Sequence, residues 1–179
     1  MTTCIHQVCQ ARPKGVAVCI VDPRRRKVLL GRERFGKYRG KYNLCAGSVE
    51  PEDGGCAVAA AQRELREEFK LALNWDRCFA PKMCRRPDAL RFVMVGPTPV
   101  FVGLLPLEEV DHRLLTQRMQ LAIKDDGLPG THKEMEAVEW FSWGADDGSD
   151  ADAAAAAWSR FARVALRKVG QRLRCLTPR

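Results

Sequence analysis

The sequence lacks any run of about 18 uncharged apolar residues, the length that a membrane-spanning helix requires. Its N-terminus, MTTCIHQVCQARPK, has no apolar segment behind a basic start and so differs from a secretory signal peptide. We therefore expect an intracellular, cytoplasmic protein with no membrane partner. The sequence also shows no internal repeat, which excludes solenoid and propeller architectures.

No two cysteines have the CxxC spacing, although the chain holds 8 cysteines. They are scattered through a sequence whose 46% hydrophobic residues can form an ordinary core, so we expect thiols rather than a disulfide framework. A zinc site would have to draw on separated donors that fit no common zinc module, and we do not expect one. Those donors are Cys4, His6, Cys9, Cys78 and Cys84.

The stretch GRERFGKY lacks the last residue of a P-loop. Gly31, Gly36 and Lys37 have the required spacing, but Tyr38 stands where a serine or threonine hydroxyl would hold Mg²⁺. Bulky side chains also crowd a loop whose backbone amides would have to cradle phosphate. A P-loop NTPase is therefore not expected.

The chain does have the length and charge of a single domain that meets a polyanion. Its 179 residues allow one ordinary core with a terminal extension. The net charge of +8 raises the local concentration of phosphate-bearing ligands. Charge alone leaves nucleic acid, a nucleotide polyphosphate and a membrane surface open as partners.

Apolar, β-branched runs alternate with few helical segments, which favours an α+β fold with a mixed sheet over a doubly wound parallel sheet. The first two runs are joined by PRRR and predict a hairpin. Strands are expected at 15–22, 27–34, 42–47, 91–95, 100–105 and 135–143, and helices at 56–69, 107–126 and 153–174.

The segment QRELREEFKL carries three glutamates at helical spacing. Glu67 and Glu68 lie three and four residues after Glu64, so on a helix the three project to one side. The apolar positions of this helix, Val58, Ala61, Leu65 and Phe69, leave Glu64 and Glu68 off the expected buried stripe. The segment alone fits either a solvated face or a site for a hard divalent cation.

In its wider context this segment resembles the box of the Nudix hydrolases. That box is a glycine, a glutamate six residues on, seven more residues, then Arg-Glu-aliphatic-any-Glu-Glu-any-Gly-aliphatic. The second half is matched by Arg63, Glu64, Leu65, Glu67, Glu68 and Leu71, and the first by Gly47 with the acidic cluster Glu50, Glu52 and Asp53. GKYRGKYNLCAG and EEFK are similar to Nudix proteins of large DNA viruses.

The match departs from the family pattern at two places. Gly47 precedes Arg63 by two residues more than in the box, so no single acidic residue can be assigned to the middle position. Lys70 replaces the glycine after the double glutamate, where a left-handed conformation costs a non-glycine residue about 1 kcal/mol. Loop geometry is affected more than the carboxylate face of the helix.

The resemblance covers about residues 15 to 142 and implies a Nudix-like α/β/α sandwich with a mixed sheet and a C-terminal helix. It divides the chain into an N-terminal arm (1–14), a Nudix hydrolase domain (15–145), and an acidic hinge with a basic amphipathic helix (146–179). The implied cofactor is Mg²⁺ or Mn²⁺, and Glu64, Glu67 and Arg63 are the implied catalytic residues. The implied metal ligands are Gly47, Glu64, Glu67, Glu68 and Glu134, with Glu136 as rival to Glu134.

Two basic regions are candidates for substrate binding. The first, which leads into the box, would hold phosphates and contains Arg32, Arg34, Lys37 and Arg39. In the C-terminal helix an apolar face (Trp158, Phe161, Ala162, Ala165, Val169 and Leu173) is expected opposite Arg160, Arg163, Arg167 and Arg174. That basic face fits either solvent or RNA.

The function expected from the resemblance is hydrolysis of a nucleoside diphosphate linked to another moiety. One alternative is mRNA decapping, in which that moiety is a capped RNA. The other is a non-catalytic Nudix domain that binds nucleotide or RNA.

Overall fold

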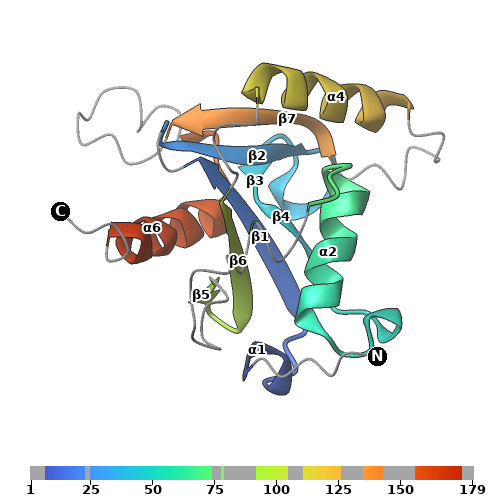
Figure 1. Ribbon diagram of the computed structural model, residues 1–179, viewed down its shortest axis with the longest axis vertical. Coiled ribbons are helices and arrows are strands. Elements are labelled where there is room, and N and C mark those ends of the chain that lie inside the picture. The colour runs from blue at the N-terminus through green and yellow to red at the C-terminus, as the bar shows by residue number, and fades with distance from the viewer. Residues whose placement is uncertain are drawn as a thin grey trace.

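In the computed structural model, the described part of the chain comprises residues 7–22, 25–73, 78, 92–104, 111–125, 135–142 and 156–174. Seven strands in this part form one sheet (Figure 1). They are β1 (Gly15–Asp22), β2 (Lys27–Glu33), β3 (Tyr42–Asn43), β4 (Cys45–Ser48), β5 (Phe92–Val95), β6 (Thr98–Leu104) and β7 (Met135–Ser142). The helices are α1 (Gln7–Gln10), α2 (Ala57–Glu68), α4 (His112–Asp125) and α6 (Arg160–Arg174), with 3₁₀ turns η1 (Gly36–Tyr38) and η2 (Pro51–Asp53).

The sheet is mixed, with β1 at its centre. β1 and β2 form the expected antiparallel hairpin, in which Asp22 pairs with Lys27. β6 lies parallel to β1, whereas β4 pairs with the first half of β1 in antiparallel register, so that Gly47 lies opposite Val16. β7 runs antiparallel along β2. The prediction of an α+β fold with a mixed sheet is confirmed.

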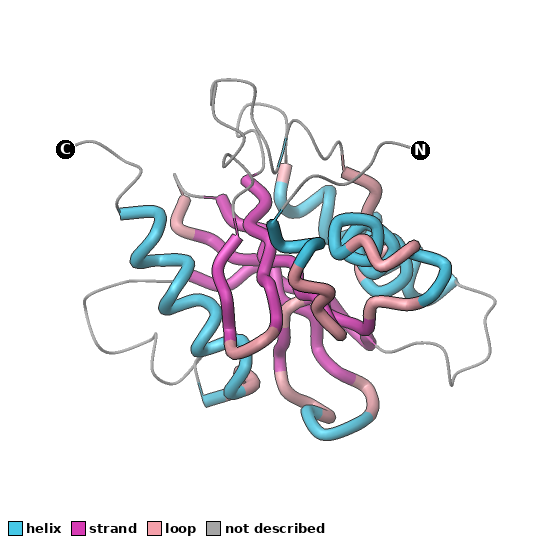
Figure 2. The backbone as a smooth tube through the Cα atoms, turned by 90° about the horizontal axis from the view of Figure 1, so that it is seen from below, coloured by secondary structure: helices cyan, strands magenta, loops and turns pink. Residues whose placement is uncertain are grey.

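Helices cover both faces of this sheet, as the alternation of β1 requires. Val16, Val18 and Ile20 belong to a core shared with α1, α2 and α4. The alternate residues of the strand belong to a second core beneath α6. Figure 2 shows the strands lying between helices on two sides. The expected α/β/α sandwich is thus observed.

The third predicted strand, 42–47, is instead two strands. β3 pairs with β2, and β4 pairs with β1, with Leu44 between them. Leu44 is fully buried in the core under α6. The chain therefore changes strand partner at this residue, which an uninterrupted apolar run does not reveal.

The C-terminal helix begins later than the predicted residue 153. Residues 153–155 lie outside the described part, but the segment before Arg160 is paired with β3: the Tyr42 N–H donates to the Ala157 carbonyl at 2.9 Å. Ser159 then ends this extended segment, because its Oγ accepts from the Ala162 N–H at 2.9 Å as an N-terminal cap. The pairing of residues 157–159 with β3 therefore sets the start of α6 at Arg160.

The faces of α6 agree with the predicted amphipathic pattern. Ala162, Ala165 and Val169 are buried against the sheet, and Leu166 joins them. Arg160, Arg163 and Arg167 are exposed on the other side, together with Lys168. The side chains of Leu173 and Arg174 lie outside the described residues.

The helix predicted at 107–126 is observed as α4 from His112 to Asp125, and residues 107–110 and 126 lie outside the described part. No helix in the described residues is long and apolar enough to cross a membrane. Within the same residues the cysteines are thiols, as expected: Cys9, Cys19, Cys45, Cys56 and Cys78.

His112, at the start of α4, should make stability pH-dependent. Its Nε2 lies 2.9 Å from Oδ2 of the buried Asp22, and its ring stacks on Trp140. Burial lowers the pKa of His112 more than the Asp22 carboxylate raises it. The pKa of His112 is therefore lower in the folded protein than in the unfolded chain, where it is about 6.5. Because the unfolded chain binds the proton more readily, the contribution of His112 to stability is complete above that pH and declines as the pH falls below it.

We expect the free energy of unfolding to fall between pH 8 and pH 5 in urea titrations, and to fall less in His112→Asn, whose amide can still donate to Asp22. Identical pH profiles for the two proteins would contradict this role of His112.

Candidate functional site

The carboxylates of α2 do not all lie on its solvent side. Glu64 and Glu68, one turn apart, are each 6% exposed, whereas the Glu67 side chain is 57% exposed. The Glu68 Oε2 accepts a hydrogen bond from the Ala46 N–H of β4 at 2.9 Å. The expectation that Glu64 and Glu68 lie off the buried face was therefore wrong.

Small side chains explain this burial. Ala57, Ala60 and Ala61 are fully buried and let α2 approach the sheet closely. The buried face of the helix is therefore rotated from the predicted Val58 stripe toward the alanines, and Glu64 and Glu68 continue it at spacings of three and four residues. A buried carboxylate is costly unless charged or polar partners surround it, so these two positions indicate a built site.

Gly47 of β4 accommodates the Glu64 carboxylate. A Cβ atom on Gly47 would overlap both oxygens and the carboxyl carbon of Glu64. Any other residue would push this carboxylate away from the strand. The close approach explains why the motif has a glycine here, and it brings Glu64 against the backbone whose carbonyl the sequence predicts as a ligand.

Arg63 connects the acidic groups of the site. Its Nη1 donates to Glu64 Oε1 at 2.8 Å and to Glu67 Oε2 at 2.9 Å, and its Nη2 donates to the Ser48 carbonyl at 2.8 Å. Nε and Nη2 also reach the two oxygens of Asp53, at 3.3 and 3.1 Å. One guanidinium therefore joins the helix, the end of β4 and the loop between them, and holds the glutamate side chains in place.

The charges of this cluster reinforce one another. Hydrogen bonding to Asp53, more than to Glu67, raises the pKa of Arg63. Burial opposes ionisation of Asp53, but hydrogen bonds from Arg63 and from the Glu50 N–H lower its pKa overall. Asp53 and Arg63 are therefore both charged at neutral pH, where they form an ion pair.

The structure favours one acidic residue of the loop for the middle position of the box, which the sequence left open. Asp53 is six residues after Gly47, as the family's glutamate is, and it is the acidic loop residue that Arg63 binds. The two extra residues then follow it as Gly54 and Gly55, which both have positive φ, 61° and 71°. Glycine adopts that conformation at no steric cost, so the insertion is accommodated before α2 starts.

Lys70 has the left-handed conformation expected for the box glycine, with φ of 52°. The Leu71 N–H donates to the Leu65 carbonyl at 3.0 Å, which closes the end of α2. The helix thus ends as the family pattern predicts, and the strain of a non-glycine residue is borne by Lys70.

Comparison with protein-family models identifies a NUDIX domain over residues 11–157. The chain belongs to the Nudix domain family. The predicted enzyme class, a Nudix hydrolase, agrees with this assignment. No curated protein matches the chain significantly.

Solved structures with a similar fold come from bacteria. A Francisella tularensis bifunctional NMN adenylyltransferase/ADP ribose pyrophosphatase, complexed with AMP and a Mn ion, has 17% identity and a TM-score of 0.50 over 87% of this chain. The chain spans 41% of that protein, and this likeness shows the fold alone. The Nudix domain of Shewanella oneidensis NrtR, complexed with ADP ribose, has 14% identity and a TM-score of 0.49 over 91% of this chain and 87% of that chain.

The E. coli dihydroneopterin triphosphate pyrophosphohydrolase has 20% identity and a TM-score of 0.47 over 86% of this chain and 92% of that chain. The comparisons do not support the resemblance to Nudix proteins of large DNA viruses.

The donors of the Nudix helix fit a hard divalent cation. Carboxylate oxygens are the ligands that Mg²⁺ and Mn²⁺ prefer, and Glu64, Glu67 and Glu68 project from successive turns beside Gly47. Within the described residues no group of three acidic, histidine or cysteine side chains is already placed to hold one metal ion. Arg63 donates to one oxygen of Glu64 and to one oxygen of Glu67. The predicted ligand Glu134 lies outside the described residues.

The predicted phosphate-binding residues lie on β2 and the turn that follows it. Arg32 forms an ion pair with Glu136 of β7 at 2.8 Å, which also gives this rival of Glu134 a structural partner. Arg34 stacks on the ring of Phe35, and Lys37 on that of Tyr38. Arg39 directly follows η1 and is exposed.

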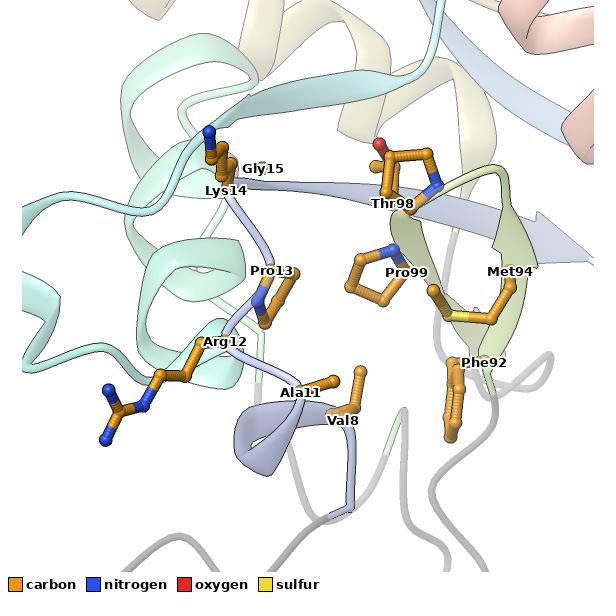
Figure 3. Close-up of a pocket in the computed structure, with 11 residues that line it drawn as sticks. Val8, Ala11, Arg12, Pro13, Lys14, Gly15, Phe92, Met94, Thr98 and Pro99 are labelled. Atoms are coloured by element: carbon orange, nitrogen blue, oxygen red, sulfur yellow. The ribbon is translucent and has the colours of Figure 1, made fainter.

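A cavity of about 640 Å³ lies at the N-terminal end of β1. In Figure 3, Pro13 and Pro99 face one another across it, and Phe92 and Met94 lie on the side of Pro99. Further lining residues are Val8, Ala11, Arg12, Lys14, Gly15, Pro97 and Thr98. Backbone contacts connect the wall of the cavity to the end of β4, the strand that carries Gly47. Gly15 pairs with Ser48, and the Val49 N–H donates to the Lys14 carbonyl at 3.0 Å.

Sequence reasoning missed two parts of this site. Asp53 was one of three acidic candidates, although its spacing from Gly47 could have singled it out. Phe92 and Met94 had no local signal, because the cavity is formed by segments about 80 residues apart that meet only when β1 and β6 pair.

Proposed function

We propose that this protein is a metal-dependent Nudix pyrophosphohydrolase that cleaves a nucleoside diphosphate linked to another moiety. The observation that carries the proposal is the gathering of Glu64, Glu67 and Asp53 around Arg63, beside a glycine that leaves room for a carboxylate. Burying the carboxylates of Asp53 and Glu64 opposes folding, which supports a role for them in binding a ligand. Membership of the Nudix family supports the same reaction.

In this proposal Glu64, Glu67, Glu68 and the Gly47 carbonyl hold Mg²⁺ or Mn²⁺, with Glu134 as a further ligand. The bound cation would neutralise the charge of the pyrophosphate and lower the pKa of the attacking water. Arg63 keeps the glutamates in the required rotamers. Glu64 or Glu67 accepts the proton from water, with Glu134 as the alternative base.

The cavity at the N-terminal end of β1 supports a substrate with a flat apolar part. Phe92 offers an aromatic face, and the prolines Pro13 and Pro99 form rigid apolar walls. A nucleobase fits this chemistry, and its phosphates would extend toward Gly15 and Ser48 and so toward the carboxylates. Arg32, Arg34, Lys37 and Arg39 are the proposed phosphate ligands from β2 and the following turn. The Francisella tularensis structure with AMP and a Mn ion is consistent with this choice of ligands.

A substrate panel tests the proposal. Nucleoside diphosphate sugars, dinucleoside polyphosphates and capped RNA should be assayed with Mg²⁺ and with Mn²⁺, and we expect turnover of at least one small dinucleotide. For that substrate Phe92→Ala should lower kcat/KM by about 10- to 100-fold, mainly through KM, because stacking contributes binding energy of about 1–3 kcal/mol. Leu121→Ala, which removes an exposed apolar side chain from α4 away from the cavity lining, is the control.

Hydrolysis of every small substrate at equal rates in Phe92→Ala and wild type would exclude the cavity as the base site. Binding without any turnover would instead favour a non-catalytic nucleotide-binding domain.

Decapping is the second candidate, and the exposed basic face of α6 favours it. Arg160, Arg163 and Arg167 follow one side of the helix, where they could track an RNA backbone. Cleavage of capped RNA without cleavage of small dinucleotides would support decapping over the first proposal. Loss of that cleavage after neutralising the three arginines would assign the RNA contact to α6.

A further inference from the structure

Two cysteines from separate segments meet beside the Nudix helix. Cys9 lies in α1, and Cys56 directly precedes α2, 47 residues later in the chain, yet their Sγ atoms are 3.8 Å apart. Figure 1 shows α1 at the lower end of α2, where that helix starts. The two sulfurs are in contact and need only to approach to about 2.05 Å to be bonded.

The two thiols differ in access to solvent. Cys9 is 9% exposed, whereas Cys56 is half-buried at the surface of the same core. A small reagent can therefore reach Cys56 first, with Cys9 directly behind it. Cys19 provides a contrast: it is fully buried in β1, and burial raises its pKa to about 12, so it stays protonated and unreactive.

We propose that Cys9 and Cys56 are a redox-active dithiol that closes to a disulfide by exchange with a small-molecule disulfide such as oxidised glutathione. The Cys56 thiolate attacks one glutathione sulfur, forming a mixed disulfide and releasing one glutathione thiolate. The Cys9 thiolate then attacks the Cys56 sulfur, which forms the Cys9–Cys56 bond and releases the second glutathione thiolate. The two protons of the cysteines pass to the two glutathiones, so the protein loses two electrons and the oxidant gains them.

This bond would tether α1 to the start of the Nudix helix. Val8, Ala11 and Arg12, on or beside α1, line the cavity described above. The disulfide would close a loop of nearly fifty residues that contains β1 to β4 and the first half of the box. Because cross-linking a loop of this length restricts the unfolded chain, the oxidised protein should be the more stable form. The inference does not depend on the proposed reaction.

The test compares the full chain after treatment with oxidised glutathione and after treatment with dithiothreitol. We expect the oxidised protein to lose the mass of two hydrogen atoms, and unreduced peptide mapping to join the Cys9 and Cys56 peptides. Its Tm should rise by about 5–10 °C, and dithiothreitol should reverse both changes. Cys9→Ala and Cys56→Ala should each abolish the cross-link and the rise in Tm, whereas the control Cys19→Ala should retain both.

Several results would overturn the proposal. They are a glutathione adduct that persists on Cys56, a cross-link to another cysteine such as Cys78 of the same core cluster, and the absence of any cross-link. A Cys9–Cys56 bond that leaves the Tm unchanged would overturn the tethering of α1 to α2. If Cys9→Ala does not fold, Cys56→Ala, with its more exposed side chain, gives the same comparison.

Discussion

Replacing Glu67 with glutamine is expected to lower kcat by at least about 100-fold while leaving the fold intact. The glutamine Oε1 can still accept the hydrogen bond that Arg63 donates to Glu67 Oε2, so the arrangement around the guanidinium is retained. What is lost is one negative charge that would hold the cation. Because the Glu67 side chain is 57% exposed, the substitution buries no new polar group.

The measurement is kcat at saturating Mg²⁺ or Mn²⁺ on the best substrate of the panel, together with the Tm of each protein. Asp125→Asn at the end of α4 is the matched control, since it removes the same charge from an exposed helix position. It should leave kcat within about twofold of wild type, because a distant exposed charge acts weakly through solvent. Wild-type turnover in Glu67→Gln would contradict the assignment of the acidic cluster as the catalytic site.

The strands of this protein were predicted well where one apolar run corresponds to one strand. β1 is observed at the predicted residues 15–22, and β7 matches its prediction from Met135 to Ser142, while residue 143 lies outside the described part. Such runs carry their own periodicity, and their register follows from the hairpin at PRRR or from burial on both faces. These features are local, so the sequence contains them.

The errors lie where distant segments decide the structure. The start of α6 depends on hydrogen bonds between Tyr42 and the segment at 157–159, more than 100 residues away. Likewise, the sequence pattern of α2 predicts an apolar stripe whose Ala61, Leu65 and Phe69 are buried as expected, but the close approach of β4 also buries Glu64 and Glu68. Periodicity identifies a helix and its charged residues, but the neighbouring strand determines which of them become buried.

The candidate site shows the same division. Three glutamates at fixed spacing were sufficient to predict the acidic helix, and the position of Gly47 agrees with its close contact to Glu64. The choice of Asp53 among three loop carboxylates required the position of Arg63. Sequence motifs therefore identified the acidic groups that we propose as cation ligands, whereas the cavity that we propose for the rest of the substrate became visible only in three dimensions.

Arg63→Ala should cost the most stability of any single change in the site. The Arg63 side chain is only 15% exposed, and its guanidinium donates to Asp53, Glu64, Glu67 and the Ser48 carbonyl. Its removal leaves the buried carboxylates of Asp53 and Glu64 beside one another without this partner. We expect a loss of about 3 kcal/mol in the free energy of unfolding and a fall in Tm of roughly 6–12 °C.

The control is Arg66→Ala, three residues further along the same helix. Arg66 is exposed, and in the described residues its Nε donates to the Gln62 carbonyl of the same helix. It should cost less than about 0.5 kcal/mol. Arg63→Lys should restore only part of the loss, because an ammonium group cannot form the paired bonds to both oxygens of Asp53.

The pH dependence distinguishes this ion pair from a packing effect. The pKa of Asp53 is lowered in the folded protein, so its contribution is present at neutral pH and is lost as pH falls below about 4 through that lowered pKa. The stability difference between wild type and Arg63→Ala, measured by urea unfolding, should therefore shrink between pH 7 and pH 3. A difference that stays constant over this range would mean that Arg63 acts through its apolar stem rather than through the charge it places among the carboxylates.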